Sequence, residues 1–409
     1  KISDGILKDV KNLPQVLRVN SVNFKKWENS LSKIVKNKNL LPAGFSDKLY
    51  PKSQKQTLIV EKVLNFFSKF SYLRISPPLI EFEETLLSEG PGVTLKENTF
   101  RIMDPITNRM MALRSDMTTQ ISRISSSRMK HYPRPLRLSY SGDVLRVKST
   151  TLNMNRQVTQ VGAEIIGKVN DELESEIILI ALNTLSSLKI KNLSIDLNFP
   201  NLKKFFLKGF SKKMQQNVGE AIERKDLNFL ENNMFPYKAE IINLIKNSGY
   251  FENSKNFLQK LTKKNQENKQ IIYLVKIAAK IKHNFENVDI IIDPLETNSS
   301  NYHNGLTFTI FSKDVRGGIA KGGTYKTIAG EKATGISIYT ELINNIPDFM
   351  SKKKRVLLKS LDFVNANFLI EQGYNVVFVK NFNNNNFVTI AKKMNCGYVF
   401  IKNNLKKIK

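Results

Sequence analysis

Cysteine and histidine are scarce in this sequence. Its 409 residues include one cysteine, Cys396, and three histidines, His131, His283 and His303. A single cysteine excludes an intramolecular disulfide and any zinc site with several cysteine ligands. The histidines share no metal-ligand spacing. We therefore expect no metal, no cofactor and a reducing, cytoplasmic location.

Long apolar runs are also missing. A transmembrane helix needs about 20 consecutive, mostly apolar residues, and the richest run here, residues 177–185, is interrupted by Asn183. The sequence therefore predicts no membrane span. Its length and its hydrophobic fraction of 41% fit two or three domains with buried cores.

Acidic residues are few relative to basic ones. The chain has 64 Lys and Arg against 36 Asp and Glu, which gives a formal net charge of +28. Basic surfaces attract phosphate backbones, but these lysines are scattered rather than gathered into a stripe, as a nucleic-acid footprint would require. We interpret the charge mainly as compositional bias, and keep nucleic-acid binding as an alternative.

The first half of the chain shows signals of both helices and strands. Residues 1–40 carry no recognisable chemistry and form an unassigned N-terminal extension. An amphipathic helix is predicted up to Phe70, and the apolar face expected for it consists of Leu58, Val63, Leu64 and Phe67. Consecutive prolines favour a strand edge over 75–82. A hairpin over 100–114, a helix over 115–128, antiparallel strands over 135–147 and 156–167, and a helix over 171–188 follow.

The second half predicts an insertion and a further domain. Residues 200–287 show no strand alternation, so we expect a wholly helical insertion. Strands resume at 288–294, 306–311 and 319–325, and the last sixty residues alternate strands with helices. We therefore expect a core over 41–346, with the insertion 200–287, and a small α/β C-terminal domain over 352–409.

Several motifs occur in an order typical of one enzyme family. LPAGFSD, then LRSD before a helix, then a strand pair ending in QVGAEIIG resemble class II aminoacyl-tRNA synthetases of the histidyl type, from Leu41 to about Ile346. The resemblance implies an α+β fold. Its centre would be a class II synthetase-like antiparallel sheet with flanking helices, a helical insertion and a small C-terminal α/β domain.

The resemblance also implies a pocket for free histidine. An amino acid needs carboxylates for its ammonium and a fixed cation for its carboxylate. Asp116 and Glu164 match the family's ammonium-binding acids, Arg146 matches its motif 2 arginine, and Tyr302 with His303 falls on the tyrosine pair of the imidazole pocket. The residues expected to bind histidine are Asp116, Thr118, Arg146, Gln160, Glu164, Tyr302 and His303.

Residues that the family uses to activate ATP are replaced. Asn298 and Leu342 stand where histidyl enzymes carry arginines, Thr324 replaces the arginine of the G-G-R-Y-D signature, and Lys148 replaces an acid that contacts adenine. Loss of one such charge-stabilising donor typically slows a reaction about a hundred- to a thousandfold. We therefore expect no catalytic residues and no aminoacylation.

A fold that keeps its amino-acid pocket but lacks the residues for nucleotide chemistry resembles the regulatory subunits of ATP phosphoribosyltransferase. LRSDMTTQISRI, YHNG with KDVRGG, GEKATGISIYTELI, LNFPNL with AIERKDLNFLE, and the tail RVLL…EQGYNVV…KKMNCGYVFI carry this resemblance; KGGTYK departs from it. It implies a non-catalytic subunit that activates a short catalytic subunit in the first step of L-histidine biosynthesis and mediates allosteric feedback inhibition by histidine. A dimeric core within a hetero-octamer is also implied. A divergent histidyl-tRNA synthetase remains the alternative.

Overall fold

A computed structural model describes residues 41–87, 90–148, 155–259, 266–296, 302–343, 354–359, 362–380 and 386–408. The chain divides into two units, up to Ile346 and from Pro347 onward. The N-terminal extension 1–40 and Asn298 lie outside the described residues. None of the helices in the described ranges is long and apolar enough to cross a membrane.

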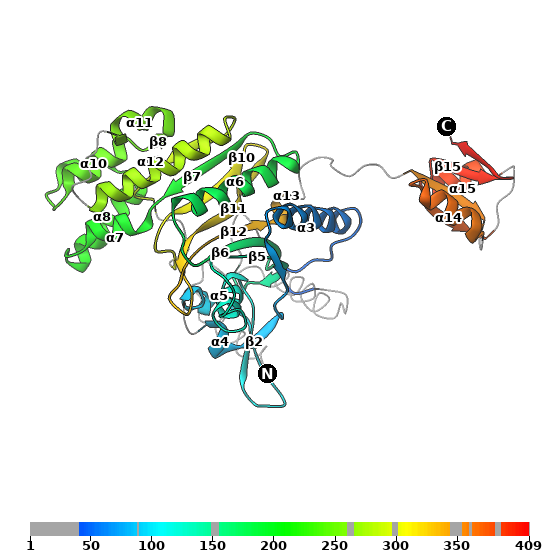
Figure 1. Ribbon diagram of the computed structural model, residues 1–409, viewed down its shortest axis with the longest axis horizontal. Helices are drawn as coiled ribbons and strands as arrows, with labels where there is room; N and C mark the ends of the chain where they lie inside the picture. Colours follow the sequence, from blue (N-terminus) through cyan, green and yellow to red (C-terminus); the bar gives the residue numbers. More distant parts are fainter. Residues whose placement is uncertain are drawn as a thin grey trace, which may run out of the picture. The chain divides into compact units, whose positions relative to one another are not determined.

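A nine-stranded sheet forms the centre of the first unit (Figure 1). Neighbouring strands are antiparallel except for the pairs β1–β5 and β7–β9, so the predicted antiparallel sheet is confirmed. In spatial order the strands are β1 (Leu73–Ile75), β5 (Leu136–Leu145), β6 (Gln157–Ile166), β12 (Lys332–Tyr339), β11 (Val315–Lys326), β10 (Thr307–Ser312), β7 (Leu193–Asn198), β9 (Asp289–Ile292) and β8 (Gly249–Tyr250).

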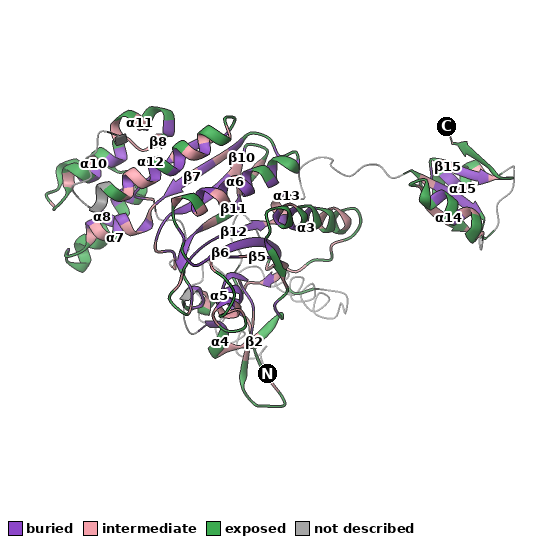
Figure 2. Ribbon diagram, viewed as in Figure 1, coloured by how far each residue is buried: buried purple, intermediate pink, exposed green. Residues whose placement is uncertain are grey.

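Helices α6 (Asp171–Ser187) and α12 (Gln266–Asn284) pack against this sheet (Figure 1). The N-cap of α6 is Asn170, whose side chain accepts a hydrogen bond from the Leu173 amide at 3.0 Å. Three acids in the first turn interact favourably with the positive end of the helix dipole. Its apolar residues face inward, as the purple stretches in Figure 2 show.

Helix α3 (Lys52–Lys69) corrects one detail of the predicted amphipathic helix. Its buried residues are Ile59, Val63, Leu64 and Phe67, whereas Leu58 is 37% exposed. The apolar face therefore includes Ile59 in place of Leu58. Residues at i, i+4, i+5 and i+8 share a helix face, and Ile59 completes that pattern with Val63, Leu64 and Phe67.

Further elements lie beside the sheet. The predicted hairpin is β3 (Arg101–Met103) with β4 (Met110–Leu113), and β4 also pairs with β2 (Ile80–Phe82). The prolines at 77 and 78 separate β1 from β2. Three short helices also contact these strands or the sheet. They are α4 (Glu83–Leu87), which contacts β2 and β4, the 3-10 helix η2 (Gly90–Asn98), which contacts β11, and α5 (Thr118–Ser126), which contacts β6.

The insertion is helical with one exception. It contains α7 (Pro200–Leu207), α8 (Lys212–Arg224), α9 (Leu227–Asn232), α10 (Lys238–Lys246), α11 (Phe251–Gln259) and α12. Gly249 and Tyr250 form β8 at the sheet edge, paired with β9. The wholly helical prediction is wrong for these two residues, because a free sheet edge supplies backbone partners that no local pattern reveals.

The second unit has its own small sheet. Its strand order is β14 (Asn375–Val379), β13 (Arg355–Lys359), β15 (Tyr398–Ile401) and β16 (Asn404–Lys407); the first three are parallel and β16 is antiparallel. Helix α14 (Phe363–Glu371) contributes to an apolar cluster with Val356 and Leu358, and α15 (Phe387–Lys393) to another with Leu357 and Val399. Cys396 is buried in the second cluster.

Candidate functional site

One face of the central sheet provides the wall of a cavity. Residues opposite one another in an antiparallel ladder project to the same face. The register places Thr309, Lys321, Ser337, Gly162 and Tyr140 in one row across β10, β11, β12, β6 and β5. A second row, two residues further along each strand, contains Thr307, Gly323, Gly335 and Glu164.

The cavity has a volume of about 340 Å³. That size suits a small ligand. Residues of η2 and the start of α5 close the side opposite the sheet. The polar and aromatic residues that line it include Asn98, Asp116, Thr118, Arg146, Glu164, Tyr302, His303, Thr307, Thr309, Lys321, Tyr325, Ser337 and Tyr339.

Glu164 lies in the cavity wall, 1% exposed. Its Oε1 accepts hydrogen bonds from the hydroxyls of Tyr140 at 3.0 Å and Thr118 at 3.1 Å, and its Oε2 accepts one from Tyr325 at 3.0 Å. Burial raises the pKa of Glu164 to about 8, against the opposing effect of these hydrogen bonds. The carboxyl is therefore mainly protonated at neutral pH, and a nearby cation would favour its ionised form.

Two glycines make room for the side chains of this wall. A Cβ atom on Gly335 would overlap the Glu164 carboxylate. A Cβ atom on Gly323 would lie 2.8 Å from Cδ2 of His303, closer than carbon atoms approach without repulsion. Both positions therefore require glycine for steric reasons, without any need for a positive φ.

Asp116 and Gln160 form the next part of the site. Asp116 Oδ1 accepts hydrogen bonds from the Thr118 amide at 2.8 Å and from Gln160 Nε2 at 3.3 Å. Gln160 also donates to Ser337 Oγ at 2.6 Å and accepts from the Met117 amide at 3.0 Å. Since Gln160 is fully buried, it holds the start of α5 against the sheet.

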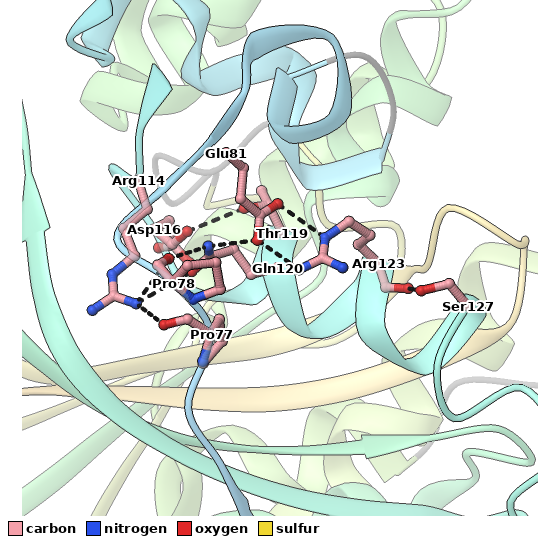
Figure 3. Close-up of polar contacts among 9 residues, drawn as sticks. All are labelled: Pro77, Pro78, Glu81, Arg114, Asp116, Thr119, Gln120, Arg123 and Ser127. Atoms are coloured by element: carbon pink, nitrogen blue, oxygen red, sulfur yellow. Dashed lines mark hydrogen bonds and ion pairs between the residues drawn. The ribbon is translucent and has the colours of Figure 1, made fainter. Parts of the chain in front are cut away.

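A second polar network fixes α5 from the other side (Figure 3). Arg123 donates to both carboxylate oxygens of Glu81, at 2.9 and 2.6 Å. Gln120 donates to Glu81 Oε1 at 2.8 Å and to the Pro78 carbonyl at 2.7 Å. Arg114 donates to the Pro77 carbonyl at 2.9 Å. These bonds tie the segment that carries Asp116 to the β1–β2 connection.

Arg146 provides a cation in the same cavity. It donates to the Tyr339 hydroxyl at 3.2 Å, and its guanidinium lies 5.1 Å from the centre of that ring. Desolvation opposes its charge, but Tyr339 and Asp116 raise its pKa above the ordinary value. Arg146 is therefore a permanent positive charge.

Aromatic rings form the remaining wall. Tyr302 and His303 lie with ring centres 4.4 Å apart, and Tyr302 meets Tyr325 edge-on at 6.0 Å. The structure thus brings all seven predicted histidine-binding residues to one place. Six line the cavity, while Gln160 is fully buried and does not line it.

Sequence reasoning missed several residues of the site. Tyr325, Tyr339, Ser337 and Lys321 line the cavity, and Tyr140 donates a hydrogen bond to Glu164. Alternation along each strand was the available signal, because Lys321 and Tyr325 share a face with Gly323, and Ser337 and Tyr339 share one with Gly335. Without the strand register, that signal does not say which face borders a ligand.

Three replaced positions lie in the described part of the chain. Thr324, fully buried on the opposite face of β11, donates to Glu174 of α6 at 2.5 Å. Leu342 is partly buried in α13 (Thr340–Ile343). Lys148 is exposed and pairs with Glu97 at 3.2 Å. None of the three lines the cavity.

Known proteins resemble this chain in both sequence and fold. A family model described as histidyl-tRNA synthetase matches residues 44–343. An ATP phosphoribosyltransferase regulatory subunit from Rhodospirillum centenum is 33% identical, covering 90% of this chain and 96% of that protein. One from Rhodospirillum rubrum is 35% identical, with coverage of 70% and 75%.

Solved structures show the same fold at lower identity. A protein from Bacillus halodurans, titled an ATP phosphoribosyltransferase regulatory subunit/histidyl-tRNA synthetase, matches with a TM-score of 0.71 at 19% identity, covering 89% of this chain and 98% of that one. Histidyl-tRNA synthetase from Nostoc matches with a TM-score of 0.72 at 16% identity, covering 90% and 92%. Both likenesses concern the fold alone.

Proposed function

The chain belongs to the family of ATP phosphoribosyltransferase regulatory subunits, which is related to histidyl-tRNA synthetase, and from this membership we propose how it acts. It binds a short catalytic subunit and activates the transfer of a phosphoribosyl group from PRPP to N1 of ATP. Histidine, the product of the pathway, binds to the regulatory chain and lowers that activity. The chain itself catalyses no reaction.

The cavity suits a free amino acid. Its acids, Asp116 and Glu164, can hold cationic groups of the ligand, and Arg146 can hold an anionic group. Tyr302 and His303 offer ring surfaces against which an imidazole can pack. The observation that carries the proposal is that one cavity brings together two acids, Asp116 and Glu164, and one cation, Arg146, since these charges match the ammonium and the carboxylate of a free amino acid.

Feedback inhibition requires a difference in affinity. Histidine can shift the complex toward an inactive state only if it binds that state more tightly than the active one. Allosteric coupling of about 1–3 kcal/mol is usual, which changes affinity about 5- to 150-fold. Linkage is reciprocal: a factor by which histidine changes the affinity for the catalytic subunit is also the factor by which the subunit changes the affinity for histidine.

The replaced residues argue against adenylate formation. Adenylate chemistry needs positive groups directed at the phosphates of ATP. Thr324 instead forms a hydrogen bond with Glu174, and Lys148 pairs with Glu97 at 3.2 Å. Leu342 and Asn298 carry no charge. A divergent synthetase would need phosphate-binding groups at other positions.

Calorimetry with L-histidine tests the pocket. Asp116→Asn removes one acid without changing the shape of the side chain, and we expect it to weaken binding at least about tenfold, as for a lost charge-assisted hydrogen bond. Asp314→Asn, in an exposed turn outside the cavity, is the matched control and should bind as the unmodified chain does. Histidine-dependent exchange of pyrophosphate into ATP should be absent; robust exchange would instead establish the synthetase function.

The partners follow from the same proposal. We propose a dimeric core that joins catalytic subunits in a hetero-octamer in the cytoplasm. Copurification with the short catalytic subunit, followed by determination of the mass of the complex in solution, tests the stoichiometry. A chain that stays separate from the catalytic subunit at micromolar concentration would contradict the proposal.

A further inference from the structure

Lys321 lies in the cavity wall at a position that the synthetase-like motifs do not assign. It is on β11, between Thr309 of β10 and Ser337 of β12 in the ladder. All three residues line the cavity. Strand β12 separates Lys321 from β6, which carries Glu164; two strand spacings amount to about 10 Å.

Lys321 lacks an acidic partner. Neither Lys321 nor Arg146 forms an ion pair with a carboxylate of the described residues. Although the side chain of Lys321 is exposed in the chain by itself, partial desolvation lowers its pKa, and the positive charge of Arg146 lowers it further. Two cations therefore border one cavity and repel each other.

Thr307 adds an unsatisfied polar group to the same wall. It is 2% exposed, and its Oγ1 has no hydrogen-bond partner among the described residues. Thr307 lies two residues from Thr309 on β10 and also lines the cavity. Because a buried hydroxyl without a partner is costly, this atom also indicates that a polar ligand or water completes the wall.

We propose that Lys321, together with Arg146, binds the carboxylate of the amino-acid ligand and selects ligands that carry this group. The inference rests on the proposed histidine pocket and deepens it. An anion between the two cations would relieve their repulsion and supply the missing ion-pair partner for both. The acids on β6 and before α5 would then remain available for the ligand's cationic groups.

The test compares L-histidine with L-histidinol, which keeps the ammonium and imidazole but carries a hydroxymethyl group in place of the carboxylate. Calorimetry should show that the unmodified chain prefers histidine about ten- to a hundredfold, the usual worth of a charge-assisted hydrogen bond. Lys321→Met should lose most of this preference by weakening histidine alone, and Lys321→Arg should keep most of it.

Lys326→Met is the matched control. Lys326 lies on the same strand and is exposed, as Lys321 is, but it does not line the cavity, so its replacement should leave the preference unchanged. Thermal unfolding of each variant checks folding; removal of a repelled charge should not destabilise the chain. If Lys321→Met prefers histidine as strongly as the unmodified chain does, the inference is wrong while the histidine pocket stands.

Two further results would have different consequences for the proposal. If the unmodified chain binds neither ligand, the proposed function fails, and the role of Lys321 fails with it. A phosphate could also satisfy the two cations, so L-histidinol phosphate is the third ligand. Tighter binding of the phosphate ester than of histidine, lost in Lys321→Met, would show a phosphate subsite and overturn the assignment to a carboxylate.

Discussion

Glu164 lines the cavity, and its ionisation differs between the folded and the unfolded chain. Its pKa is about 8 in the folded chain, against 4.5 for an ordinary glutamate side chain. Between these values the folded state binds more protons than the unfolded state, so the contribution of Glu164 to stability falls as pH rises. The full effect has an upper bound of about 5 kcal/mol.

The variant Glu164→Gln isolates this contribution, because glutamine has a similar shape and does not titrate. Denaturant titration measures the free energy of unfolding of both proteins. As the pH rises from 5 to 8.5, the unmodified chain should lose several kcal/mol of stability relative to the variant. A difference that stays constant over this range would show that Glu164 remains ionised in the folded chain.

Gly335 should tolerate no side chain. Gly335→Ala would force the Glu164 carboxylate out of its position, and we expect about 1–3 kcal/mol of destabilisation, as for an overpacked core, with loss of histidine binding. Gly397→Ala is the control, because its added Cβ would meet nothing within 4 Å. Equal effects of the two substitutions on thermal unfolding would contradict the steric argument.

At the scale of residues, the sequence predicted the site residues that stand in motifs better than those that stand in strands without a motif. Asp116, Thr118 and Glu164 stand in recognisable motifs, and the structure gathers them. Lys321 and Tyr140 occur within strands whose sequences contain no distinctive motif at those positions. Lys321 lines the cavity and Tyr140 contacts Glu164 because of which strands are neighbours, and their own segments do not encode that order.

One buried acid of helix α6 contacts both the sheet and the insertion. Glu174 is 1% exposed and accepts hydrogen bonds from Thr324 of β11 and Tyr273 of α12, each at 2.5 Å. Lys332 of β12 lies 3.5 Å from the same carboxylate. A charged group in this position is stable only when its partners are present.

Thr324→Val removes one of these partners while keeping the size of the side chain. We expect a loss of about 1–3 kcal/mol in the free energy of unfolding, because a buried carboxylate loses a hydrogen bond. Thr334→Val is the control: Thr334 is the cross-strand neighbour of Thr324, equally buried, with only a 3.5 Å contact to the Gly323 carbonyl. Equal losses in both variants would show that Glu174 does not depend on Thr324.

At the scale of elements, periodicity predicted most helices and strands but not all of their contacts. It placed the helix that became α3, yet assigned Leu58 to its buried face in place of Ile59, although with 3.6 residues per turn Leu58 lies on the side of the helix opposite Val63, Leu64 and Phe67. It missed β8, whose two residues form a strand only because β9 offers a free edge.

The whole molecule consists of two units with separate cores. The first is built on the nine-stranded sheet and the second on its own four-stranded sheet, with apolar clusters on both faces. Alternating strands and helices predicted the type of the second core, and the synthetase-like motifs predicted that of the first. The strand order did not follow from the sequence, since it joins segments far apart in the chain such as β6 and β12.

This division predicts that the histidine pocket does not need the second unit. A fragment of residues 1–346 should bind L-histidine with the affinity of the full chain, because every residue that lines the cavity lies before Ile346. Calorimetry on both proteins measures this, after circular dichroism has shown that the fragment is folded. A folded fragment that binds histidine more than tenfold more weakly would show that the second unit contributes to the site.

The most direct test of regulation is the initial rate at which the short catalytic subunit forms phosphoribosyl-ATP, measured with and without this chain across a titration of L-histidine. The account predicts that the chain raises the rate, that histidine lowers it again, and that Asp116→Asn shifts this inhibition to higher histidine concentrations. A rate unaffected by the chain, or inhibition by histidine that is equally strong in Asp116→Asn, would contradict it.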